Sequence, residues 1–302
     1  IKCKKPCGFK DKKGFHEACS YPNPKKGFVK IRGVKYWVEI EGNGPPLLMI
    51  QGGPLFDHRY FHPHFSTLSD NHTLIYCDLA GRYISKPLKN NKYGIKNDII
   101  DLDSLRIKLE IDDWSVLGHS FGGYIAMLYA NHYPKRTNKL FLVSTPLGIK
   151  KDNYDSVRTT VMEKYFSNVS TKKANIKAHK KFNFNKIPES DSLEYWKKTL
   201  KSYNNYSYFD TLKKEYIEST REQWVNNIGP EFIETYDSFY NVSIPWYNLI
   251  GMKDEIGFQK STIKATNKSA KGHVIKFYNS KHFPWIEEKE KFFNQLSTIL
   301  TE

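Results

Sequence analysis

The chain has 302 residues, 39% of them hydrophobic and 26% charged, and its formal net charge at pH 7 is +15. This length and apolar content suffice for one large or two modest domains with a sizeable core, and the longest apolar run, Pro45 to Ile50, is too short to span a membrane. The lysines are spread along the whole chain without a helix-turn-helix, zinc-finger or RNP pattern, so we expect a solvated basic surface and no nucleic-acid binding.

The first 26 residues form a cysteine-bearing leader. Cys3, Cys7 and Cys19 lie in it, whereas Cys77 lies in an apolar run and is expected to be a free, buried thiol. We expect a disulfide in the leader; a zinc site that includes His16 is the alternative, although the spacing matches no common finger. The chain begins with Ile rather than Met, which indicates processing after export or a trimmed start. The cysteines favour a periplasmic or secreted protein, with a cytoplasmic location as the alternative.

Between residues 27 and 146, strand and helix patterns alternate. Gly27 to Glu41 alternates apolar and polar residues around Gly33, which predicts a hairpin. Unbroken apolar runs predict buried strands at residues 46–50, 73–77, 114–117 and 139–144, and apolar spacing predicts helices at 58–68 and 95–109, with a loop at 78–87. This order predicts a mostly parallel sheet with helices on both faces.

Residues 147–241 differ in character, because lysine, asparagine and aromatic residues dominate and no buried strand pattern occurs. Helical spacing in several segments predicts an inserted helical cap. After it, the sheet is expected to resume with strands at residues 244–250 and 274–278 and a closing helix at 283–300. The predicted core therefore consists of residues 27–146 and 242–302, with the cap inserted between them.

The five residues from Gly118 to Gly122 are the strongest functional signal. They place Ser120 between two glycines, where an expected strand becomes an expected helix. Such an elbow holds a serine hydroxyl clear of the backbone, at the positive end of the helix. A short pattern of this kind can arise by chance, but its position favours Ser120 as a nucleophile. His119 adjoins the serine and is expected to point elsewhere.

A serine nucleophile needs a base and a carboxylate that orients the base. Asp254 and His282 each follow an expected core strand near the end of the chain. The order Ser120, Asp254, His282 is the one expected of an α/β-hydrolase. Asp237 is the nearest competitor for the carboxylate, and most of the other histidines are expected at the surface.

Acyl transfer also needs backbone N–H donors for the oxyanion of the tetrahedral intermediate. Phe121, directly after the nucleophile, is one candidate, and Gly53, in the glycine pair after the strand expected at residues 46–50, is the other. Epoxide hydrolases and dehalogenases of this fold carry an aspartate at the elbow, so Ser120 disfavours those activities. No cofactor and no metal are expected for this chemistry.

From about Gly27 to its end, the chain resembles the prolyl aminopeptidase (proline iminopeptidase) branch of the α/β-hydrolases, the peptidase S33 family. Gln51-Gly-Gly-Pro54 is similar to the family's His-Gly-Gly-Pro-Gly, and residues 78–87 are similar to its Asp-x-x-Gly-x-Gly-x-Ser-x-x-Pro. Residues 118–123 match its Gly-x-Ser-x-Gly-Gly, and residues 224–232 of the cap resemble Tyr-x-x-x-Asn-Gly-Pro-Asn-Glu-Phe.

The chain departs from the family pattern at four points. Gln51 replaces the histidine, Leu55 and Tyr83 each replace a glycine, and one residue is missing between Pro230 and Glu231. These departures leave the three triad residues in place and bear on substrate choice.

The resemblance implies substrate-binding roles for Trp224, Glu231 and Glu255, in which the two glutamates hold the substrate's free α-amino group. It implies a serine hydrolase that releases an N-terminal residue, proline or a small apolar one, from short peptides or amino-acid amides and esters. An esterase or lipase acting on uncharged acyl esters, and a non-catalytic binding protein on the same fold, are the alternatives. The expected partner is the small substrate, and the oligomeric state is left open.

Overall fold

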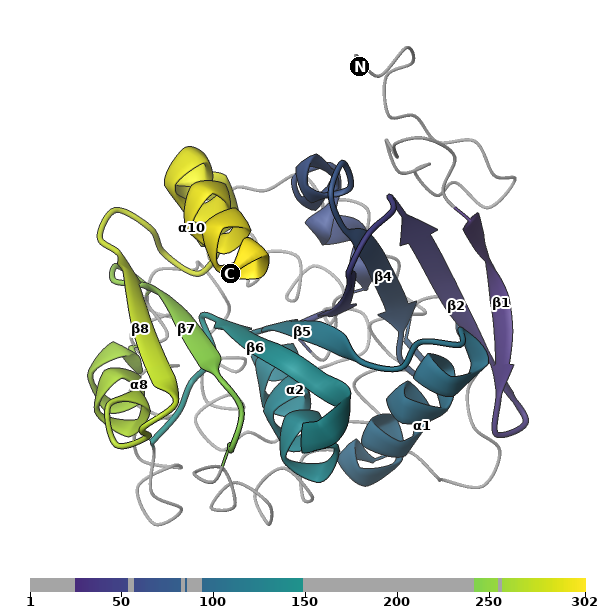
Figure 1. The fold of residues 1–302 in the computed structure, drawn as a ribbon. Helices are drawn as coiled ribbons and strands as arrows, with labels where there is room; N and C mark the ends of the chain where they lie inside the picture. Colours follow the sequence, from purple (N-terminus) through teal and green to yellow (C-terminus); the bar gives the residue numbers. More distant parts are fainter. Residues whose placement is uncertain (1–24, 54–56, 83–84, 86–93, 149–241, 255–256) are drawn as a thin grey trace, which may run out of the picture.

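The computed structural model of the chain describes residues 25–53, 57–82, 85, 94–148, 242–254 and 257–302. Its centre is an eight-stranded sheet with the order β1-β2-β4-β3-β5-β6-β7-β8 (Figure 1). The pairs β1–β2 and β2–β4 are antiparallel, and every pair from β4 to β8 is parallel. The predicted α/β-hydrolase sheet is confirmed.

The strands follow the apolar runs of the sequence. They are β1 Lys25–Ile31, β2 Val34–Glu41, β3 Pro46–Ile50, β4 Thr73–Asp78, β5 Trp114–His119, β6 Thr137–Val143, β7 Trp246–Gly251 and β8 Gly272–Phe277. The α-helices of the described residues are α1 Ile95–Lys108, α2 Phe121–His132, α8 Gln259–Thr266, α9 Pro284–Glu287 and α10 Lys289–Thr301. The same part of the chain also contains three short 3-10 helices, η1 His58–Phe61, η2 Phe65–Leu68 and η3 Pro134–Arg136.

Each face of the sheet has its own apolar core. On one face α1, α2 and α8 cover a cluster that includes Trp114, Ile125 and Cys77, and the Cys77 thiol is free and buried as predicted (Figure 1). On the other face η1, η2, α9 and α10 cover a cluster that includes Phe65 and Trp285. Because both faces are covered, the parallel strands have no polar side, which explains their unbroken apolar runs.

The predicted hairpin consists of β1 and β2, which pair from Lys25 opposite Ile40 to Ile31 opposite Val34. Arg32 and Gly33 connect them, with φ angles of 45° and 90°. A two-residue hairpin turn with positive φ at both central positions matches the twist of the strands. Gly33 supplies one of these positions without steric cost.

Two helix predictions were wrong in detail. The helix expected at 58–68 is two separate 3-10 helices, η1 and η2, because Pro63 lies between them and has no N–H to continue a helix. The closing helix is divided into α9 and α10 at Glu288, whose φ and ψ are −129° and 54°. The side chain of Glu288 accepts hydrogen bonds from Asn279 N–H and Ser280 Oγ, both at 2.8 Å, and these contacts hold this residue out of the helix. Helix α8 was not predicted from the sequence.

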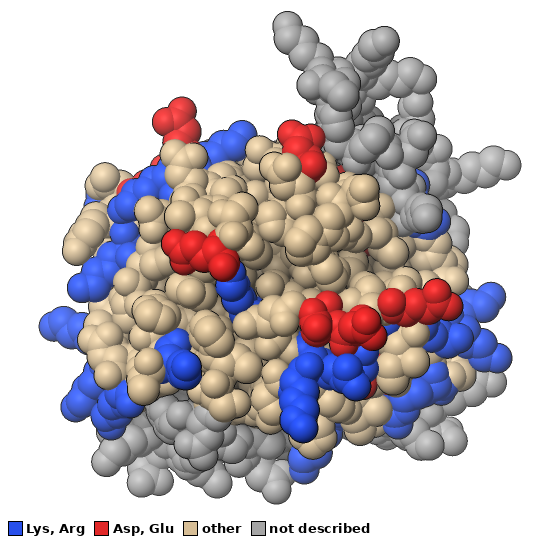
Figure 2. Space-filling model, viewed as in Figure 1, with Lys and Arg blue, Asp and Glu red and all other residues tan. Residues whose placement is uncertain are grey.

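Residues 1–24 of the leader and nearly all of the expected cap lie outside the described residues, whereas Lys25 and Lys26, which the prediction assigned to the leader, begin β1. Leu147, at the start of the cap range, packs in the core, and its N–H donates to Thr262 Oγ1 of α8 at 2.9 Å. None of the described helices has the length and hydropathy that a membrane crossing requires. On the face shown in Figure 2, the Lys and Arg side chains lie in several separate groups, some of them beside Asp and Glu.

Candidate active site

Ser120 lies between the end of β5 and the start of α2. Its φ and ψ are 52° and −119°, a backbone conformation that residues other than glycine rarely adopt and that costs free energy. Two hydrogen bonds hold it, from Ser120 N–H to Val143 O at 2.8 Å and from Gly123 N–H to Ser120 O at 3.0 Å. This is the strained strand-to-helix turn that the G-x-S-x-G pattern predicts.

The flanking glycines are required by close backbone contacts. A Cβ on Gly118 would lie 2.3 Å from Gly122 O, and a Cβ on Gly122 would lie 2.3 Å from Gln51 O. The elbow therefore packs directly against the end of β3. A Cβ on Gly52 would lie 3.2 Å from Ser120 Cβ, which places the glycine pair beside the proposed nucleophile.

His282 and Asp254 come together from two loops at the carboxyl ends of β7 and β8. His282 Nδ1 lies 2.6 Å from Asp254 Oδ2, and the His282 side chain is 4% exposed. A carboxylate at Nδ1 orients a histidine and keeps Nε2 available to accept a proton. The structure thus joins the two C-terminal residues that the sequence selected, although 28 positions separate them.

The loop that carries His282 is held by the carboxylate of Glu287 at the end of α9. Glu287 accepts hydrogen bonds from Lys281 N–H at 2.8 Å and from Phe283 N–H at 3.3 Å. Burial raises the pKa of Glu287 although these hydrogen bonds oppose the shift. Glu287 was not identified from the sequence, because nothing in its spacing marks a contact with the preceding loop.

His119 connects the elbow to the same loop. Its Nε2 lies 3.0 Å from the carbonyl oxygen of His282, and its Nδ1 lies 3.0 Å from Tyr60 Oη. Gly52 N–H donates to the same Tyr60 oxygen at 2.8 Å. Burial and the nearby His282 hold the pKa of His119 well below its usual range, so His119 is neutral. Both ring nitrogens are engaged away from Ser120, as the sequence predicted, and Tyr60 is a residue that the sequence did not reveal.

Gly53 and Phe121 are the expected oxyanion donors, and both belong to the described residues. Gly53 follows β3 with φ 91°, and Phe121 is the first residue of α2. Gln51, which stands where the resembling family has a histidine, is 2% exposed. With its amide nitrogen directed at Cys77 O, 3.0 Å away, its oxygen accepts from Leu79 N–H at 3.2 Å. Gln51 therefore ties the end of β3 to the end of β4.

Trp224, Glu231 and Glu255, the expected substrate-binding residues, lie outside the described residues, as does Asp237. The expectation that most other histidines lie at the surface was wrong for the part of the chain that the structure describes. There only His132 and His273 are exposed, whereas the remaining histidines are partly or fully buried.

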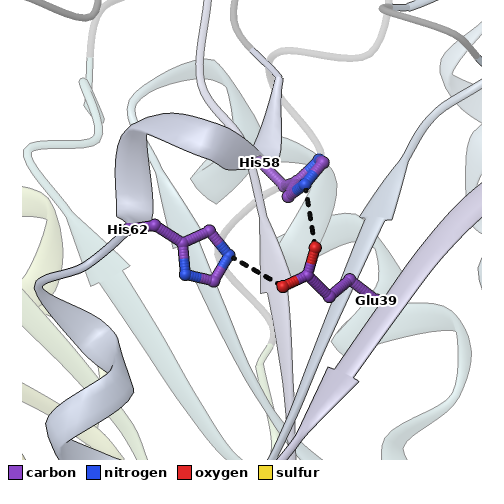
Figure 3. Close-up of side chains that lie close together, drawn as sticks. All are labelled: Glu39, His58 and His62. Carbon is purple, nitrogen blue, oxygen red and sulfur yellow. Dashed lines mark ion pairs between the residues drawn. The ribbon is translucent and has the colours of Figure 1, made fainter. Parts of the chain in front are cut away.

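Two of those histidines, His58 and His62, lie against Glu39 of β2 in a group that could hold a metal (Figure 3). Burial alone would raise the pKa of Glu39, but His58 and His62 lower it to about 2. Burial lowers the pKa of His62 to about 4. Burial also opposes protonation of His58, but Asp78 and Glu39 outweigh it and raise the pKa of His58 to about 10. The alternating pattern of β2 concealed this group, because Glu39 reads there as a solvent-facing residue.

Comparisons with known proteins agree with this architecture. Residues 45–289 match the family described as alpha/beta hydrolase fold. A cis-3-alkyl-4-alkyloxetan-2-one decarboxylase of Shewanella oneidensis is 34% identical over 124 residues, which cover 40% of this chain and only 39% of that protein. A proline iminopeptidase of Saccharolobus solfataricus is 25% identical over 301 residues, with 93% of each chain covered.

Among solved structures, an esterase from Exiguobacterium antarcticum superposes with a TM-score of 0.63 at 19% identity, covering 91% of this chain and 99% of that one. At this identity the likeness shows the fold alone. The family match spans the sheet from β3 to β8 together with Ser120, Asp254 and His282. The chain therefore belongs to the alpha/beta hydrolase fold family.

Proposed function

We propose that this hydrolase acts by acyl transfer, with Ser120 as nucleophile, His282 as general base and Asp254 as the residue that orients the base. The observation that carries the proposal is the 2.6 Å contact between His282 Nδ1 and Asp254 Oδ2. His119, the neighbour of Ser120, contacts the carbonyl oxygen of His282. This contact ties the loop of the base to the elbow of the nucleophile.

In this mechanism Ser120 Oγ attacks the carbonyl carbon of the substrate while His282 Nε2 accepts the hydroxyl proton. The negative charge develops on the carbonyl oxygen, where the Phe121 and Gly53 amides stabilise it. His282 then returns the proton to the leaving amine or alcohol, and an acyl-enzyme remains. Water, activated by the same histidine, hydrolyses this ester and regenerates Ser120.

We infer that the substrates carry a free N-terminal amine. The inference is supported by the proline iminopeptidase that aligns over 93% of both chains and by the cap motif of the sequence. Glu231 and Glu255 would accept charge-assisted hydrogen bonds from the ammonium group, each worth about 1.5 to 3 kcal/mol. An acetylated amine would leave these carboxylates without a cationic partner, so blocked substrates should be rejected strongly.

The decisive experiment compares Ser120→Ala with Ser115→Ala, a serine variant on β5, the strand that leads into the elbow, over paired substrates. The pairs are proline and alanine anilides with a free or an acetylated amine, together with simple acyl esters. Ser120→Ala should lower kcat by about 10⁴-fold or more, whereas Ser115→Ala should retain activity. The free-amine anilides should be cleaved much faster than their acetylated partners.

Each other outcome has a definite meaning. Retention of most activity in Ser120→Ala would overturn the catalytic assignment. Equal rates on free and blocked amines, or a preference for acyl esters, would replace the aminopeptidase with an esterase while retaining the triad. An inactive wild-type chain that also fails to react with a fluorophosphonate would support the non-catalytic binding protein.

A further inference from the structure

Glu39, His58 and His62 form a buried cluster, hereafter the Glu39 cluster, that takes no part in the proposed catalysis. Glu39 Oε2 lies 3.5 Å from His58 Nε2, and Glu39 Oε1 lies 3.6 Å from His62 Nε2 (Figure 3). We propose that the Glu39 cluster binds one divalent transition-metal ion of the Zn²⁺ type, with the Glu39 carboxylate and the two Nε2 atoms as ligands.

The spacing of the donor atoms suits a metal better than direct hydrogen bonds. An N–H···O hydrogen bond spans about 2.7 to 3.2 Å, which is shorter than both contacts. Two ligand atoms bound tetrahedrally to zinc at its usual bond lengths are separated by about 3.3 Å. The proposed ligand atoms all lie within 4.8 Å of one another, so small side-chain adjustments would bring them around one ion.

One carboxylate oxygen of Glu39 lacks a hydrogen-bond partner among the described residues. Its side chain is only 4% exposed, and its Oε1 atom is buried without a hydrogen bond from the described residues. A buried carboxylate oxygen that accepts no hydrogen bond loses the free energy of its hydration. A cation between Glu39 and the two imidazoles would compensate for that loss.

The contacts between Asp78 and His58 are typical of a histidine that binds a metal. Asp78 Oδ2 lies 2.9 Å from His58 Nδ1, and Asp78 Oδ1 accepts a hydrogen bond from the backbone N–H of His58 at 2.9 Å. These contacts fix the ring so that Nε2 faces Glu39. A carboxylate that binds the second nitrogen of a histidine ligand is the usual outer contact of zinc sites.

The charges of the cluster favour a divalent ion. Glu39 and Asp78 bring two buried carboxylates, while the adjacent Asp57 is compensated by Arg59, whose Nη2 lies 2.8 Å from it. In the metal-free chain, His58 forms ion pairs with both Glu39 and Asp78 at the position of the proposed ion. Two neutral imidazoles and a carboxylate suit zinc and its neighbours, whereas Ca²⁺ and Mg²⁺ prefer oxygen ligands alone.

The position of the cluster predicts a structural ion. His58 and His62 stand on either side of Tyr60, which contacts Gly52 and His119. An ion held by both histidines and by β2 would fix η1 against the sheet. Metal binding should therefore raise the melting temperature, by mass action.

The test uses the full chain, freed of metal with a chelator and then equilibrated with Zn²⁺ or with Co²⁺ as a spectroscopic probe. Bound zinc is measured by mass spectrometry after gel filtration, and melting temperature is measured in parallel. The wild type should retain about one zinc per chain and melt at a higher temperature with zinc than without. Its cobalt form should show the visible bands of tetrahedral nitrogen and oxygen ligands without a thiolate charge-transfer band.

Four variants locate the ion. Glu39→Gln and His62→Gln should each weaken zinc binding by about tenfold or more and abolish the zinc-dependent rise in melting temperature. His72→Gln, a buried histidine outside the cluster, should bind zinc as the wild type does. The triple variant Cys3→Ser, Cys7→Ser, Cys19→Ser should also retain it, since the proposed ligands are not in the leader.

The proposal is overturned if the wild type retains no zinc, if Glu39→Gln and His62→Gln bind it normally, or if only the triple cysteine variant loses it. Should the two cluster variants fail to fold, the cobalt spectrum of the wild type decides. A thiolate band then assigns the ion to the leader and rejects the Glu39 cluster.

Discussion

A single oxygen, Tyr60 Oη, joins three segments at the proposed active site. It accepts the Gly52 N–H and lies 3.0 Å from His119 Nδ1, while His119 Nε2 lies 3.0 Å from the carbonyl oxygen of His282. A carbonyl can only accept, so His119 Nε2 carries the proton and Nδ1 accepts from the Tyr60 hydroxyl. These hydrogen bonds link the glycine pair, the nucleophile elbow and the loop of the base.

Tyr60→Phe should therefore impair both stability and turnover. The change leaves the Gly52 N–H and His119 Nδ1 buried without this partner, which should lower the free energy of unfolding by about 1 to 3 kcal/mol. Because His119 and Gly52 support the proposed catalytic groups, kcat should fall more than KM rises. Urea denaturation and steady-state kinetics measure the two effects.

Tyr278→Phe is the matched control, since Tyr278 is 61% exposed. It should behave as the wild type in both measurements. Unchanged kcat in a Tyr60→Phe protein of reduced stability would show that Tyr60 is structural only.

At the residue scale, the sequence predicted those site residues that a motif or their order along the chain can identify. Asp254 and His282 were selected because they follow the last core strands, and the structure joins them. Tyr60 and Glu287 were not identified, because their contacts depend on how a turn and a helix end pack onto distant loops. Glu39 looked like an exposed position, because strand alternation does not show that η1 covers the second face of β2.

Among the elements, the junction of β5 and α2 leaves no room for an added side chain at Gly118. In Gly118→Ala, the new Cβ would meet backbone atoms, Gly122 O at 2.3 Å and Gly123 Cα at 2.5 Å. Backbone cannot move aside as a flexible side chain can, so the elbow must shift. We expect a loss of about 1 to 3 kcal/mol in the free energy of unfolding and a large loss of activity.

Gly27→Ala on β1 provides the control for the same substitution. A Cβ on Gly27 has no heavy atom within 4 Å, so its stability should match or slightly exceed that of the wild type. Circular dichroism melts of the two variants make the comparison. Equal melting temperatures would show that the elbow is looser than these contacts indicate.

The central strands β3 to β7 were predictable at the element scale because they are largely buried on both faces and therefore have apolar sequences, whereas β1 and β2 were predicted from alternating apolar and polar residues. The divisions within the helices were less visible. The helix at 58–68 was predicted across Pro63, although a proline there favours a break. The division at Glu288 depends on hydrogen bonds from Asn279 and Ser280. Such contacts arise only when β8 and its loop lie beside α9. The apolar spacing within one segment does not predict contacts of this kind.

In the whole molecule, the face of the sheet covered by η1, η2 and α10 carries several buried histidines that stay neutral. His119 has a pKa well below its usual range, chiefly through burial. Burial, followed by the charge of Lys289, lowers the pKa of His64 to about 4. In mildly acidic solution, His119 and His64 therefore bind fewer protons in the folded chain than in the unfolded chain.

The consequence for stability follows from the direction of these shifts. Between about pH 6.5, where an unfolded histidine titrates, and pH 4, where folded His64 titrates, the unfolded state binds more protons. The contribution of His64 to the free energy of unfolding therefore falls as the pH decreases through this range. His64→Gln should flatten the slope of that free energy against pH, whereas His132→Gln, which changes an exposed histidine, should leave it unaltered. Urea denaturation at a series of pH values measures both slopes. Equal slopes in the His64 variant and the wild type would show that His64 takes up protons as readily in the folded chain as in the unfolded one.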